Sequence, residues 1–76
     1  MQKGVYILAN AGPNSKKLEI HINGKFRCMS FPGGLTPVKN VKVGDIITGI
    51  IPGLFNKKVL FEFILTENEV DMNYNY

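Results

Sequence analysis

Residues 18–28 read Leu-Glu-Ile-His-Ile-Asn-Gly-Lys-Phe-Arg-Cys, and this stretch decides the fold. An Asn-Gly pair between two runs of alternating apolar residues is the strongest short-range signal of a β-hairpin. A two-residue loop, Asn23-Gly24, would set the apolar stripe of the first strand opposite cations. A three-residue loop that begins at Ile22 avoids this and places Gly24 at the left-handed position of a bulged turn. The sequence therefore predicts the three-residue loop.

The three-residue loop also predicts which side chains of the hairpin face the core. Its pairs are Ile20 with Phe26 and Leu18 with Cys28 on the inward face, and Glu19 with Arg27 on the outward face. The last of these is a favourable cross-strand charge pair.

The rest of the chain also alternates with a period of two residues, and no window shows the 3.6-residue period of a helix. Strands are predicted at residues 3–9, 17–21, 25–31, 45–51 and 58–66, with an irregular edge segment at 38–43. Two prolines and two glycines predict a loop at 32–37. Residues 70–76 alternate like a strand, and a sixth strand and a loose tail both stay open.

A chain of 76 residues forms one domain and has a marginal core, because a domain of this size buries only about 60% of its unfolded surface. One cysteine excludes an internal disulfide, and one histidine with one cysteine cannot complete a structural zinc site. No metal and no cofactor is expected. We expect an all-β, five- or six-stranded antiparallel small barrel over residues 1–66, SH3-like with an OB-like alternative. The acidic segment 67–76 would follow as a sixth strand or a flexible tail.

Residues 41–51, Val-Lys-Val-Gly-Asp-Ile-Ile-Thr-Gly-Ile-Ile, resemble the glycine–aspartate turn that leads into a barrel strand in OB-type and SH3-like domains. The resemblance covers eleven residues. It implies a tight turn that feeds a bent strand. Many such domains contact RNA or DNA, so it also implies a similar role here.

The cellular location is predicted from what the sequence contains. A single cysteine suits a reducing compartment. The apolar run at residues 4–9 is too short for a signal peptide, and the uncharged run at 46–56 is shorter than a membrane span. We expect a cytoplasmic protein that does not enter a membrane.

The residue inventory favours binding over catalysis. Nucleophilic and acid–base chemistry need a positioned base beside a nucleophile or a second carboxylate. In the predicted register His21 and Cys28 point to opposite sides of the hairpin. The carboxylates Glu19, Asp45 and Glu62 lie on separate predicted strands. We therefore expect a protein that is not an enzyme.

Two binding functions remain open, and charge motivates one of them. Residues 1–58 carry all nine basic side chains against two acidic ones, a net charge of +7, whereas residues 59–76 carry four acidic side chains and no basic one. Basic side chains at strand ends and loops can track a nucleic-acid backbone. The candidates are Lys16, Lys17, Lys25, Arg27, Lys39, Lys42, Lys57 and Lys58.

Excess apolar surface motivates the other function, which the sequence favours slightly. The strands at 45–51 and 58–66 carry Ile, Leu or Phe on both faces, and such strands are normally covered on both faces. A protein partner or a second copy would supply the missing cover. The candidate contacts are Leu60, Ile64, Ile47, Ile51, Met72, Tyr74 and Tyr76. The chain would then be an inhibitor, an adaptor-like module or a subunit of an oligomeric assembly.

Overall fold

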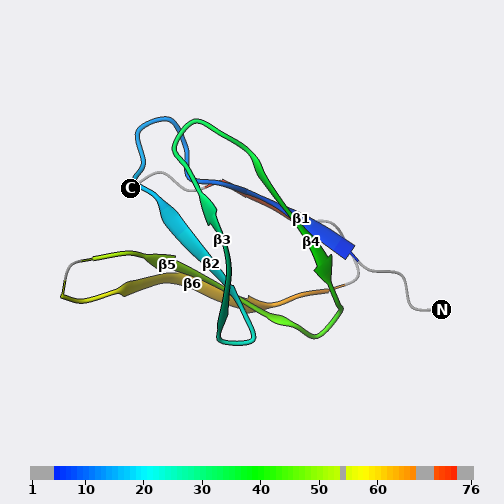
Figure 1. Ribbon diagram of the computed structural model, residues 1–76. Helices are drawn as coiled ribbons and strands as arrows, with labels where there is room; N and C mark the ends of the chain where they lie inside the picture. The colour runs from blue at the N-terminus through cyan, green and yellow to red at the C-terminus, as the bar shows by residue number, and fades with distance from the viewer. Residues whose placement is uncertain (1–4, 54, 67–69, 74–76) are drawn as a thin grey trace.

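The computed structural model of the chain describes residues 5–53, 55–66 and 70–73. Within these ranges seven strands form two sheets (Figure 1). The strands are β1 (Val5–Asn10), β2 (Leu18–Ile22), β3 (Lys25–Ser30), β4 (Thr36–Val41), β5 (Ile46–Ile51), β6 (Lys58–Ile64) and β7 (Val70–Asn73). The three-stranded sheet has the order β4-β1-β7, and the four-stranded sheet has the order β3-β2-β5-β6.

The all-β prediction is confirmed, because the described residues contain strands and turns and no helix. Their pairings are antiparallel, except that β7 runs parallel to β1. The described strands do not close into the expected five- or six-stranded barrel. The strands stay in two sheets that no described ladder joins.

The hydrophobic core lies between the two sheets and takes side chains from both. Its buried members are Ile7, Ala9, Ala11, Leu18, Ile20, Ile22, Val38, Val41, Ile47 and Leu65. Burying one such aliphatic side chain stabilises the fold by roughly 1.5–3 kcal/mol. A buried hydroxyl also joins the sheets, because Ser30 Oγ donates a hydrogen bond of 3.2 Å to the Ala9 carbonyl.

The β2–β3 turn contains two residues, so the three-residue prediction is wrong. Ile22 pairs with Lys25, and the backbones of Asn23 and Gly24 have φ angles of 53° and 81°. Positive φ at both central positions is what a type I′ turn requires, and its twist matches that of the flanking strands. The type I′ turn therefore forms although it pairs the apolar Ile22 with the cation Lys25.

A β-bulge then restores the apolar stripe. His21 pairs with Phe26 but Ile20 pairs with Cys28, so Arg27 is an extra residue in β3. Leu18 accordingly pairs with Ser30, and Glu19 with Met29. The predicted Ile20–Phe26, Leu18–Cys28 and Glu19–Arg27 pairs are wrong for this reason.

The two-residue turn also reverses the predicted position of one aromatic side chain, because it sets Phe26 opposite His21. Phe26 was expected in the core, yet its side chain is 57% exposed. It shares the outward face with His21, and the two rings meet edge to face with centroids 5.7 Å apart. Leu18 and Ile20 are buried as expected, and Cys28 packs against the core.

Strand β4 is more regular than the sequence predicts, and it begins inside the expected 32–37 loop. Pro37 pairs with Leu8 in this strand, at a sheet edge, where a missing N–H is tolerated. A second bulge sets Lys39 and Asn40 opposite a single residue of β1, and Asn40 has a φ of 61°.

At the end of the chain, residues 70–73 form β7 on β1. The strand alternative therefore holds for these four residues. Residues 74–76 lie outside the described part of the chain.

A third bulge lies in β6, where Leu60 is the extra residue between Val59 and Phe61. Strict alternation over residues 58–66 predicts that Val59 shares a face with Phe61 and Phe63, and the bulge breaks this pattern. Val59 pairs with Ile50 on the outward face and is 57% exposed.

Gly49 is required by packing at the centre of β5. Its partner across the strand pair is Phe61, and a Cβ built on Gly49 would lie inside the Phe61 ring. Glycine is thus needed here because the Phe61 ring occupies the space that a side chain at position 49 would fill.

We predict that Gly49→Ala lowers the free energy of unfolding by about 1–3 kcal/mol, because the added methyl overpacks the site. Combining it with Phe61→Leu, which makes room, should cost less than the sum of the two single changes. Urea denaturation measures all three. Gly34→Ala is the control, because a Cβ there meets only the Phe31 carbonyl at 3.8 Å. Strictly additive costs would contradict the predicted contact.

Candidate functional site

The outward face of the four-stranded sheet is mostly apolar, although the other sheet does not cover it. Strand register places the side chains of Phe26, Ile46, Thr48, Ile50, Val59, Glu62 and Ile64 on this face. Four of them are large and well exposed: Phe26, Ile46, Val59 and Ile64 at 57%, 40%, 57% and 64%. Ile64 pairs with Ile46, and Val59 pairs with Ile50, so exposed apolar side chains lie along the β5–β6 pair, where they can mark an interaction surface.

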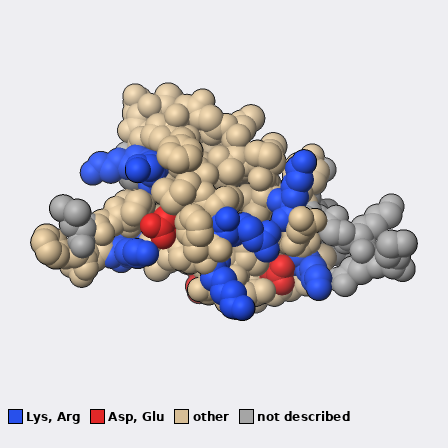
Figure 2. Space-filling view, in the orientation of Figure 1, with Lys and Arg blue, Asp and Glu red and all other residues tan. Residues whose placement is uncertain are grey.

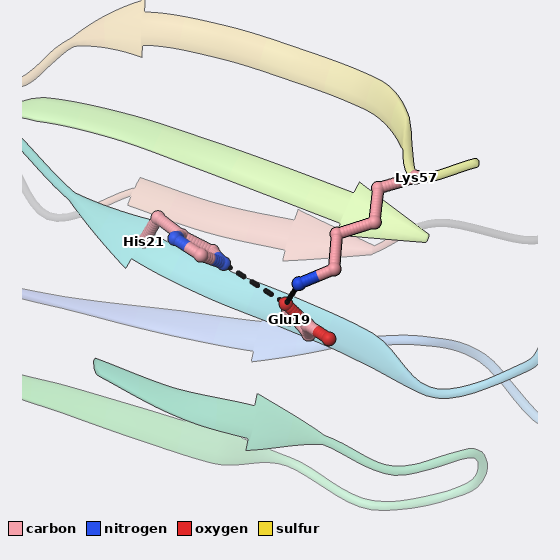
Figure 3. Close-up of polar contacts among 3 residues, drawn as sticks. All are labelled: Glu19, His21 and Lys57. Carbon is pink, nitrogen blue, oxygen red and sulfur yellow. Dashed lines mark hydrogen bonds and ion pairs between the residues drawn. The ribbon is translucent and has the colours of Figure 1, made fainter. Parts of the chain in front are cut away.

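Three polar side chains, Glu19, His21 and Lys57, form a contact group across the middle of this face, and two of them are largely buried. His21 Nε2 lies 3.0 Å from Glu19 Oε1, and Lys57 Nζ lies 3.4 Å from the same oxygen (Figure 3). The side chains of Glu19 and His21 are only 14% and 15% exposed. Because an ionised carboxylate only accepts, the imidazole N–H donates to it.

These contacts stabilise the charged form of Glu19. The hydrogen bond from His21 is the main cause that lowers the pKa of the Glu19 carboxyl, and Lys57 adds a smaller contribution. Partial burial opposes this shift. Nearby, Thr48 Oγ1 donates a hydrogen bond of 3.2 Å to Glu62 Oε2.

A separate pocket lies at one end of the molecule, beside the β2–β3 turn. Its volume is about 430 Å³, and it is lined by Ile22, Asn23, Lys25, Phe26, Arg27, Asn40, Lys42 and Asp45. It therefore combines the β2–β3 turn, the bulge residue of β3, the end of β4 and the turn before β5.

Hydrogen bonds hold the walls of this pocket together. Asn23 Nδ2 donates to Asp45 Oδ1 at 3.1 Å, and Asn23 Oδ1 accepts from the Ile46 N–H at 2.9 Å. Asp45 Oδ2 accepts from the Lys42 N–H at 2.9 Å. These bonds from the Lys42 backbone and the Asn23 side chain lower the pKa of Asp45.

The bulge of β3 and the bulge of β4 meet at the rim of the pocket. Arg27 Nη1 donates a hydrogen bond of 2.8 Å to the Lys39 carbonyl, which belongs to the bulge of β4. Figure 2 shows Lys and Arg side chains gathered over the tip of the β2–β3 hairpin and the end of β4, with one acidic patch among them.

The structure therefore collects some of the predicted basic residues and disperses others. Lys25, Arg27 and Lys42 line one pocket, and Lys39 supplies the carbonyl at its rim. Lys16 and Lys17 precede β2, whereas Lys57 and Lys58 lie at the start of β6. The eight residues do not form one patch.

The predicted protein-contact residues also separate. Ile64 is exposed on the outward face, but Ile47 is fully buried and belongs to the core. Ile51 and Leu60 are half-buried and pack against that core. Met72 belongs to β7, and Tyr74 and Tyr76 lie outside the described residues.

Sequence reasoning missed Phe26, Ile46, Val59 and Asn40 as surface residues. The two-residue turn places Phe26 outside, the bulge of β6 places Val59 outside, and neither feature leaves a period-two signal. The Asn-Gly pair was the signal in the sequence for the first bulge. It prefers a two-residue turn, and without a bulge that turn would put the apolar residues of β3 opposite the wrong residues of β2.

Chemistry at the remaining reactive groups is limited by their surroundings. Burial raises the pKa of the Cys28 thiol, which disfavours the reactive thiolate. The described residues include no group of three or more His, Cys, Asp or Glu side chains placed to hold a metal ion. In the same residues we find no helix with the length and apolar character to span a membrane.

Comparison of the chain with protein-family models, with curated proteins and with solved structures finds no match. The class that the fold defines is thus a small two-sheet β-protein with an apolar outer face and a basic pocket.

We predict that stability falls in acid through Glu19. Its pKa is lower in the folded chain, so its contribution is complete above the ordinary glutamate pKa of about 4.3 and is lost as the pH falls through the folded value. Urea titrations of wild type and Glu19→Gln at pH 7 and pH 3 measure this contribution. The wild type should be the more stable at pH 7, and the difference should shrink at pH 3. An equal difference at both pH values would contradict the assignment.

Proposed function

We propose that this protein is a non-enzymatic interaction module that binds an extended segment of a partner protein along strand β6. The observation that carries the proposal is the exposed apolar edge of the four-stranded sheet. Among the described strands β6 has one neighbour, β5, so its other side is a sheet edge. An added strand would continue the sheet through main-chain hydrogen bonds.

Strand β6 has the features that natural proteins usually avoid at an edge. It is the longest described strand, with seven residues, and its sequence Lys-Val-Leu-Phe-Glu-Phe-Ile contains no proline. Edges are commonly protected by proline, bulges or interior charges. The edge strand β4 contains Pro37 and a bulge, and the edge strand β3 is bulged at Arg27. Strand β6 has a bulge but keeps exposed apolar side chains on either side of it.

The side chains around β6 define the chemistry of the partner. On the outward face, Val59 and Ile64 are exposed, and Ile64 pairs with the exposed Ile46. On the inward face, Phe61 and Phe63 stack with centroids 5.9 Å apart and remain partly accessible. A partner strand with apolar residues at successive positions would cover both faces, because successive side chains of a strand point to opposite faces. Figure 1 shows that the β5–β6 hairpin projects to one side of the three-stranded sheet.

We predict that charged substitutions on β6 abolish this binding without unfolding the protein. The probes are peptides selected from a random library for binding to the immobilised full chain. They should carry apolar residues at successive positions, and they should shift backbone amide resonances mainly in residues 58–64. Ile64→Lys and Val59→Lys should each weaken binding at least about tenfold, because a lysine at the edge opposes strand addition. Both side chains are exposed, so stability should change by no more than about 0.5 kcal/mol.

Leu35→Lys is the matched control, because Leu35 is 66% exposed but lies in the β3–β4 loop. Resonance shifts centred on other strands, or wild-type affinity in Ile64→Lys, would refute the proposal. Sedimentation velocity at high concentration tests the alternative occupant. A dimer that disappears in Ile64→Lys would identify a second copy of the chain, in place of a different protein, as the strand that pairs with β6.

A further inference from the structure

The pocket beside the β2–β3 turn is a separate feature, because it lies at the β3 side of the sheet and β6 lies at the opposite edge. Its walls are fixed before any ligand arrives. Asn23 uses both ends of its amide, one on Asp45 and the other on the Ile46 N–H. The Asn23 N–H also donates to the Ile46 carbonyl at 2.8 Å. This preorganisation reduces the entropy that a ligand must overcome.

The pocket has an excess of positive charge. Three cations line it, Lys25, Arg27 and Lys42, against the single carboxylate of Asp45. That carboxylate is already occupied by the Asn23 amide and the Lys42 N–H. Within the described residues the ammonium groups of Lys25 and Lys42 have no hydrogen-bond or ion-pair partner. An anionic group would satisfy them.

One of the three cations is held in a fixed orientation. The guanidinium of Arg27 is tied by one N–H to the Lys39 carbonyl, and a guanidinium has five N–H donors in a planar fork. The remaining donors suit a phosphate, whose oxygens accept two parallel hydrogen bonds.

An aromatic ring completes the pocket. Phe26 lines it and is 57% exposed, although a large apolar side chain would normally be buried. His21 supports the ring edge to face, with an interplanar angle of 82°. An exposed ring beside a basic groove is the arrangement on which nucleic-acid bases stack.

From these features we propose that the pocket binds a nucleotide unit, with its phosphate on Lys25, Arg27 and Lys42 and its base stacked on Phe26. The volume of about 430 Å³ lies within the range of small-molecule sites. A single-stranded nucleic acid and a free nucleotide both supply this chemistry. An acidic peptide would satisfy the cations but would leave the ring without a partner.

The test measures fluorescence anisotropy of a labelled twelve-nucleotide oligothymidylate with the full chain over a series of salt concentrations. Removing two cations in Lys25→Gln/Lys42→Gln should weaken binding at least tenfold and reduce the salt slope by about 1.4, at about 0.7 per phosphate contact. Phe26→Leu keeps an apolar side chain without a stacking face. It should weaken oligonucleotide binding at least about fivefold, the lower end of what one stacked base contributes.

The matched control is Lys16→Gln/Lys58→Gln, which removes the same charge away from the pocket and should weaken binding far less. Poly-glutamate is the base-free competitor. The proposal fails if the control loses as much affinity as the pocket variant, if poly-glutamate binds as tightly as the oligonucleotide, or if Phe26→Leu has no effect. Absence of binding at low salt also overturns it. Thymidine monophosphate distinguishes the two sources: affinity equal to that of the oligomer indicates a free nucleotide, and much weaker affinity indicates a nucleic-acid strand.

Discussion

The backbone of Asn23 and Gly24 imposes the constraint on which the rest of the four-stranded sheet depends. Both residues have positive φ, and this geometry closes the β2–β3 hairpin in two residues. Continued without interruption, that register would place the side chains of β3 on the wrong faces. The bulge at Arg27 corrects the register, so that Ile20 and Leu18 meet Cys28 and Ser30 over the core. The extra residue Arg27 thus allows both the two-residue turn and the burial of the apolar side chains.

The two-residue turn and the bulges also create the surface features of the molecule. The two-residue turn leaves Phe26 opposite His21 and outside the core, and the extra residue Arg27 donates a hydrogen bond to the bulge of β4. The bulge at Leu60 shifts the register of β6 and places Val59 on the outward face with Ile64. Bulges commonly redirect a side chain in this manner. Phe26 in the pocket and Val59 on β6 are thus exposed, although the predicted hairpin register and an uninterrupted β5–β6 pairing would have turned them inward.

Features that depend on residues close together in the sequence could be predicted, whereas features that depend on contacts between distant segments could not. The all-β class, the hairpin at residues 18–30 and most strand positions follow from local alternation and turn residues, which one segment of sequence contains. The bulges do not follow, because they depend on the balance between turn geometry and core burial. The separation into two sheets depends on pairings between distant segments, such as β1 with β4 and β7. The burial of Ile47, a predicted contact residue, follows from the same long-range packing.

The positions of the two surfaces determine how they affect each other. Strand β3 and strand β6 are the two edges of one sheet, with β2 and β5 between them. A strand added to β6 and a ligand beside β3 would not compete for space. The Glu19–His21 pair on β2 lies between the two edges, because the His21 ring contacts the Phe26 ring and Glu19 contacts the Lys57 ammonium. His21 also pairs across the sheet with Thr48, whose hydroxyl donates a hydrogen bond to Glu62 of β6. In this row of the outward face, polar side chains of β2 and β5 therefore lie between the Phe26 ring and β6.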